Sequence, residues 1–122
     1  MKMKYEAVLP NGDRVNRKSD RIYTHVVAYR LADGRRQREA AAQYHRQAAV
    51  VGGPAGEYAV SMAAFLDKQA DSFAAAHQSG KWGVAGFCGS LKLASKLLGV
   101  QQKRLAAGYI CECRIIPVSV VE

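Results

Sequence analysis

The order of the segments with strand-like and helical periodicity is the feature of this sequence that most constrains the fold. Residues 2–9 alternate between apolar and polar as in a β-strand, two further strand-like segments follow up to residue 31, and over residues 35–79 the apolar residues recur at helical spacing. Strand-like segments return at 82–88 and 108–122, with a helical segment between them. The expected order is β-β-β-α-α-β-α-β, an α+β fold with a mostly antiparallel sheet and helices packed on one face.

Glycine, proline and polar residues mark the ends of these segments. Asn11-Gly12 predicts a hairpin turn between the first two strands, because both residues tolerate positive φ. Gly52-Gly53-Pro54-Ala55-Gly56 is expected to break the chain between helices at about 35–51 and 57–77. Ser90 is expected to cap a last, short helix that Gly99 would end.

Apolar patterning predicts which faces of these elements are buried. Residues 21–31 are apolar on both faces, which indicates a central strand, and Pro117 implies an edge position or the end of regular pairing. In the second helix, a stripe of large side chains is expected to be core: Tyr58, Met62, Phe65, Leu66 and Phe73. With 122 residues, we expect one domain over 1–122, with a helical elaboration at about 35–79.

The net charge of +8 favours an acidic partner, either nucleic acid or an acidic protein face. Basic residues dominate both ends of the sequence, and the second helix is acidic. No apolar run approaches the roughly 20 residues of a membrane span, and no hydrophobic stretch follows the basic N-terminal residues. Three irregularly spaced cysteines indicate a reduced setting, so we expect a cytoplasmic location and no membrane partner.

The first helix offers the best candidate binding surface. Arg35, Arg38 and Arg46 fall on one helix face with His45 at its margin, and Arg14, Lys18 and Arg21 could extend the patch. A merely solvated helix face is an equally good interpretation. A weaker anion site is predicted at the start of the last helix, from Ser90 with Lys92 and Lys96.

Catalytic motifs are missing from the sequence. Cys88 precedes a helix start, but the buried-thiol interpretation is favoured over a nucleophile because no arginine occurs between it and Arg104. Cys111 and Cys113 form a C-x-C pair rather than the C-x(2–4)-C knuckle of structural zinc sites. We therefore expect no enzyme activity, no metal and no cofactor.

Three fragments together carry a resemblance: R-x-Y-T-H-V-V at 21–27, W-x(4)-F-C-G-S-L-x-L-A at 82–94 and I-I-P-V at 115–118. This series resembles small proteins encoded by bacteriophages and other mobile elements. The resemblance covers roughly residues 1–31 and 82–118, and the motifs have the character of scaffold residues. It implies a host-interference protein, anti-CRISPR-like in the broad sense, that binds and inhibits a host defence complex through its basic surface. The alternative is a DNA- or RNA-binding accessory protein that uses the arginine stripe. The sequence leaves the target and the oligomeric state open.

Overall fold

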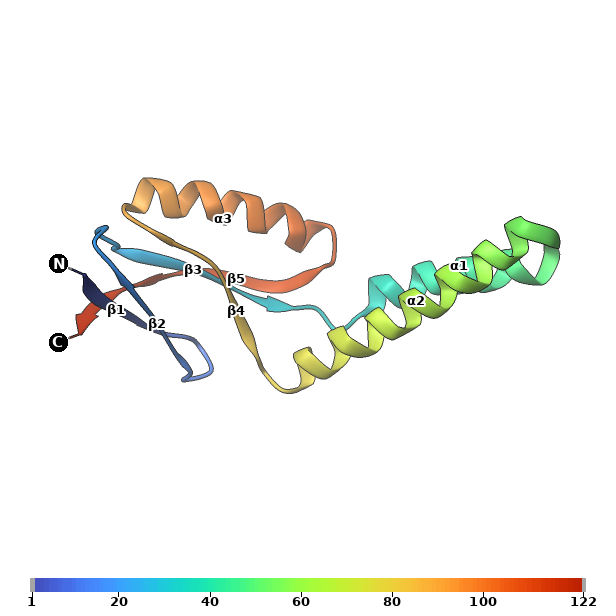
Figure 1. Ribbon diagram of the computed structural model, residues 1–122, viewed down its shortest axis with the longest axis horizontal. Helices are drawn as coiled ribbons and strands as arrows, with labels where there is room; N and C mark the ends of the chain where they lie inside the picture. Colours follow the sequence, from blue (N-terminus) through green and yellow to red (C-terminus); the bar gives the residue numbers. More distant parts are fainter. Residues whose placement is uncertain (1, 122) are drawn as a thin grey trace. The chain divides into compact units, whose positions relative to one another are not determined.

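The computed structural model describes residues 2–121 (Figure 1). It divides into two compact units, Met1–Leu31 with Gly80–Glu122, and Ala32–Ser79. Every strand pair among the described residues is antiparallel, in two three-stranded sheets, so the predicted α+β class and element order are confirmed, with a short sixth strand added. The elements are β1 (Met3–Val8), β2 (Arg14–Ser19), β3 (His25–Leu31), α1 (Arg35–Val50), α2 (Gly53–Gln78), β4 (Trp82–Cys88), α3 (Leu91–Ala106), β5 (Ile110–Pro117) and β6 (Ser119–Val121).

The β1–β2 hairpin turns at the predicted position. Gly12 takes φ 91°, and its N–H donates to the Leu9 carbonyl at 2.9 Å. Alternation buries Tyr5, Ala7 and Leu9 on one face. The other edge of β1 pairs with β6, giving the sheet order β2-β1-β6.

β3 is the central strand of the second sheet, β4-β3-β5, as its two apolar faces predicted. On one face, Val27 and Cys88 pack with Ala94 of α3. On the other face, Ala28 and Trp82 pack with Leu9 from the β1–β2 hairpin. The helix α3 and the β1–β2 hairpin therefore cover opposite faces of this sheet. Pro117 ends β5 at the sheet edge, as expected.

The prediction that Gly99 ends a short last helix is wrong. The helix α3 runs through Gly99 for 16 residues, to Ala106. The chain leaves the helix at Gly108, which takes φ 86° and donates its N–H to the Leu105 carbonyl at 3.1 Å, while Tyr109 donates to Arg104 at 3.0 Å. Gly108 thus supplies the left-handed residue that helix termination favours. Ser90 does cap the start, accepting a hydrogen bond from the Leu93 N–H at 3.2 Å.

The second unit is an antiparallel pair of helices, α1 and α2, packed on each other. The chain turns at Val51 and Gly52, because Gly53-Pro54-Ala55-Gly56, expected to lie in the break, form the first turn of α2. This is ordinary helix chemistry, since a proline in the first turn lacks only an N–H that would be unpaired there.

Small side chains make the closest part of the contact between α1 and α2. Ala59, Ala63 and Ala70 of α2 are buried, and Ala41 of α1 is buried with them. Small residues let two helix backbones approach closely, while the Tyr58 ring contacts the Tyr44 ring of α1 with centroids 6.2 Å apart. Tyr58 and Phe65 are 59% and 58% exposed, which contradicts their assignment to the core, and Met62, Leu66 and Phe73 are half-buried.

Among residues 2–121 no helix is both long and apolar enough to cross a membrane, including α2 with its 26 residues.

Candidate functional site

The first unit carries the whole net charge of the chain. Its sequence contains thirteen Lys/Arg and five Asp/Glu, whereas the helical second unit contains five of each. The net charge of +8 therefore belongs to the first unit, and the second is formally neutral. Because a summed charge of one sign attracts and steers ions of the other, an anionic partner would be drawn to the first unit.

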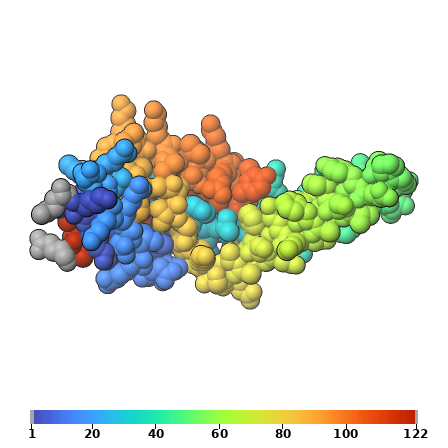
Figure 2. Space-filling model, in the orientation of Figure 1, coloured from blue at the N-terminus to red at the C-terminus, as the bar shows by residue number. Residues whose placement is uncertain are grey.

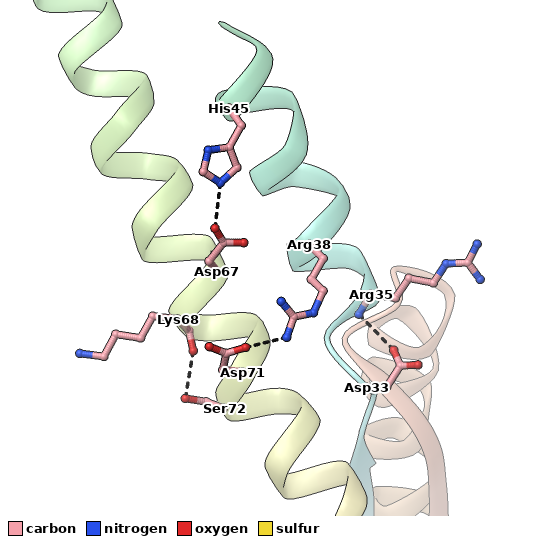
Figure 3. Close-up of polar contacts among 8 residues, drawn as sticks. All are labelled: Asp33, Arg35, Arg38, His45, Asp67, Lys68, Asp71 and Ser72. Carbon is pink, nitrogen blue, oxygen red and sulfur yellow. Dashed lines mark hydrogen bonds and ion pairs between the residues drawn. The ribbon is translucent and has the colours of Figure 1, made fainter. Parts of the chain in front are cut away.

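Carboxylates of the second unit face the predicted basic stripe on α1 (Figure 3). Arg38 Nη2 lies 2.6 Å from Asp71 Oδ1, and His45 Nε2 lies 2.8 Å from Asp67 Oδ2. Both acids belong to α2, so these contacts join the two helices. All four side chains remain substantially exposed to solvent.

The remaining residues of the stripe are Arg35 and Arg46, both exposed. Arg35 Nε lies 3.1 Å from Glu39 Oε1, one turn along the same helix. Arg46 makes no ion pair among the described residues and lines a shallow hollow with Gln43, Gln47 and Val50. Three of the four predicted residues thus have an acid of their own unit beside them, which weakens the attraction that the stripe could offer an outside anion.

Arg14, Lys18 and Arg21, the predicted extension of the stripe, belong to the first unit and not to the helical pair. Arg14 Nη1 lies 3.1 Å from Glu6 Oε1, so this charge is also partly compensated. Lys18 stands opposite Lys4 in the β1–β2 register, both exposed, which gives this face two like charges side by side. Arg21 is exposed beyond the end of β2.

The predicted anion site at the start of α3 contains two exposed lysines, Lys92 and Lys96. The Ser90 hydroxyl is occupied by the Leu93 N–H, so it acts as a helix cap. Lys92 and Lys96 are exposed and make no ion pair among the described residues. The sequence has no acidic residue between Asp71 and Glu112, so α3 carries none.

Sequence reasoning missed Lys103 because it ended the helix at Gly99. Lys103 is exposed on α3, eleven residues after Lys92. At 3.6 residues per turn, a separation of eleven residues brings two side chains back to nearly the same side of a helix. The spacing of Lys92, Lys96 and Lys103 could have identified this set, had the helix been continued through the glycine.

Cys88 lies buried at the end of β4, and burial raises the pKa of its thiol. A raised pKa disfavours the thiolate that a cysteine nucleophile requires. Strand pairing places His25 opposite Cys88, but the His25 Nδ1 atom lies 2.8 Å from the Thr24 hydroxyl.

The Cys111 thiol donates to the Leu31 carbonyl at 3.5 Å. Within residues 2–121 no three His, Cys, Asp or Glu side chains gather as metal ligands.

No protein-family model, curated protein or solved structure matches this chain in the comparisons.

Proposed function

We propose that this chain is a non-enzymatic protein that binds nucleic acid through the basic surface of its first unit. The observation that carries the proposal is the location of the charge. All of the net +8 lies on that unit, while the arginine stripe on α1 belongs to a formally neutral unit and faces its own carboxylates. A concentrated positive field of this kind supplies most of the affinity of sequence-independent nucleic-acid binding.

The burial of Cys88 supports a binding role over an enzymatic one. Cys88 is the best candidate nucleophile in the sequence, and its burial works against ionisation. The proposed partner, DNA or RNA of a host cell, suits action in the cytoplasm. No metal or cofactor is part of the proposal.

Inhibition of a host defence complex, the role implied by the resemblance to phage and mobile-element proteins, is the second candidate. The nucleic-acid channels of RNA-guided effectors are themselves positively charged, so a basic unit does not complement them. The neutral second unit is better suited to a protein partner, because Tyr58 and Phe65 are more than half exposed on it. Aromatic residues are enriched in protein interfaces, whereas lysine is depleted there.

A pull-down from host lysate, performed with and without nuclease, tests the proposal. The tagged full chain should recover nucleic acid from untreated lysate, and nuclease should remove both that material and its associated proteins. Retention of one discrete protein complex after nuclease treatment would contradict the proposal and favour the inhibitor role.

A further inference from the structure

Three lysines lie in line along the outer face of α3, and we call Lys92, Lys96 and Lys103 the lysine ridge. At 100° per residue, the three positions fall within about 40° of one another around the helix axis. The buried residues of α3, Ala94 and Gln101, lie on the opposite side, which faces the sheet. Figure 2 shows side chains of α3, in orange, standing out from the surface of the first unit.

The ridge is uncompensated. The helix α3 has no acidic residue, and no described carboxylate makes an ion pair with any of the three lysines. Arg104, the other cation of the helix, faces inward instead. Its Cζ atom lies 5.0 Å from the centroid of the Tyr29 ring, and its Nη1 donates a hydrogen bond to Gln101 Oε1 at 2.9 Å. The three ammonium groups therefore remain available to anions in solution.

Gly99 lies between Lys96 and Lys103 on the same side of the helix. A methyl group at this position would meet nothing within 4 Å, so packing does not require the glycine. A glycine inside a helix costs about 1 kcal/mol relative to alanine. Its physical effect is to leave a low point in the ridge, where another backbone can approach α3 closely.

The spacing and chemistry of the ridge fit the backbone of a nucleic-acid duplex. With a rise of 1.5 Å per residue, Lys92 and Lys103 are about 16 Å apart along the helix axis. Duplex DNA carries one charge per roughly 1.7 Å of axis, so about nine phosphates lie within this length. Lysine is a flexible point charge, suited to phosphates rather than to the reading of base edges.

The ridge lacks the aromatic side chains that binding to single strands requires. Proteins that bind single strands stack successive bases on exposed aromatic rings. In the first unit, however, Tyr5, Tyr23 and Trp82 are buried, and the exposed apolar neighbours of the ridge on α3, Leu93 and Val100, are aliphatic. The exposed ring of Tyr109 lies beyond the end of α3, outside the ridge. We infer that the lysine ridge of α3 binds the phosphate backbone of double-stranded nucleic acid without sequence preference. This inference rests on the proposed nucleic-acid binding and names its surface and its ligand.

Fluorescence anisotropy with the full chain tests the inference. The probes are a labelled DNA duplex of about 20 base pairs, the RNA duplex and the DNA single strand of the same sequence, and a duplex of shuffled sequence. The wild type should bind both DNA duplexes equally and either duplex type more tightly than the single strand. The two duplex types separate a DNA-binding from an RNA-binding function.

The matched variants remove three charges from one face or from another. K92Q/K96Q/K103Q removes the ridge, and K4Q/R14Q/K18Q removes three charges from the β1–β2 hairpin, on the other side of the sheet. Each lost phosphate contact lowers the slope of log K against log salt by about 0.9. The ridge variant should therefore lose about 2.7 from the slope, and the wild type should weaken about 40-fold more than the variant between 50 and 200 mM salt. The hairpin variant should keep most of the slope.

Four outcomes would overturn the inference: an unchanged slope in the ridge variant, an equal or larger loss in the hairpin variant, tighter binding of the single strand, or a preference between the two DNA duplexes. In these cases nucleic-acid binding itself would stand. If the wild type binds none of the probes, the proposed function fails as well. Circular dichroism verifies folding, and K96Q alone, with an expected slope loss of about 0.9, replaces the triple variant if that variant unfolds.

Discussion

Gly34 is the position at which one added methyl group should most disturb the helical unit. It precedes α1 with φ 88°, and its carbonyl accepts the Arg38 N–H at 3.0 Å. A Cβ built there would lie 2.5 Å from the carbonyl oxygen of Ala70 and 3.1 Å from its Cα. The obstacle is backbone of α2, which no side-chain rotation can relieve.

The cost of Gly34→Ala has two parts. An L-residue in the left-handed region costs roughly 1–2 kcal/mol, and overpacking against a fixed neighbour costs a further 1–3 kcal/mol. Gly12→Ala is the matched control, because Gly12 has φ 91° but nothing within 4 Å of an added Cβ. Both substitutions restrict the unfolded chain alike, so that contribution cancels when they are compared. We expect Gly34→Ala to destabilise its unit by about 1–3 kcal/mol more than Gly12→Ala destabilises the hairpin unit.

Native-state hydrogen exchange is the suitable assay, because it resolves the free energy of opening for each unit separately, whereas one global transition assumes two-state behaviour. Amides of α1 and α2 should lose protection in Gly34→Ala, and those of the first unit should not. Equal losses in the two variants would refute the argument that the backbone contact with Ala70 adds to the strain of positive φ.

Three further predictions test other parts of the structure. Gly99→Ala should stabilise the protein by about 0.5–1 kcal/mol in thermal unfolding, since the site is helical with open space around it, and a loss of stability would contradict this. Because burial raises the pKa of Cys88, the native thiol keeps its proton to higher pH than the unfolded thiol. Stability should therefore fall as pH rises above the unfolded value of about 8.5, and Cys88→Ala should show less of this fall in urea titrations at pH 7 and 9.5. Arg38→Ala should lower the free energy of unfolding by about 0.2–1 kcal/mol, because its exposed ion pair with Asp71 is lost. Arg46→Ala should change the free energy of unfolding little. Equal effects of the two substitutions would contradict a stabilising role for the Arg38–Asp71 pair.

Local signals in the sequence predicted the elements whose causes are local. Asn11-Gly12 fixed the first turn, and the Ser90 side chain caps α3 as its position indicated. Two apolar faces were enough to make β3 a central strand. The prediction that Gly99 ends α3 is wrong because a glycine stops a helix only where the chain adopts positive φ. In α3 the glycine with positive φ is Gly108.

The features that depended on distant partners were not predictable from one pattern. Two of the three acids beside the α1 stripe lie on α2, so His45–Asp67 and Arg38–Asp71 form only when the two helices fold back on each other. The same close approach rewards small residues, which is why Ala63 is buried and Phe65 is exposed. For this reason the binding surface that we propose is formed by the lysines of α3 and not by the arginines of α1.

The most direct test of the lysine ridge as the binding surface is an amide chemical-shift titration of the full chain with an unlabelled DNA duplex of about 20 base pairs. If the ridge is the binding surface, the shift changes should concentrate on residues 91–106, be largest around Lys92, Lys96 and Lys103, and leave residues 35–50 unperturbed. Changes concentrated on α1 around Arg35, Arg38 and Arg46, or no changes at all, would contradict it.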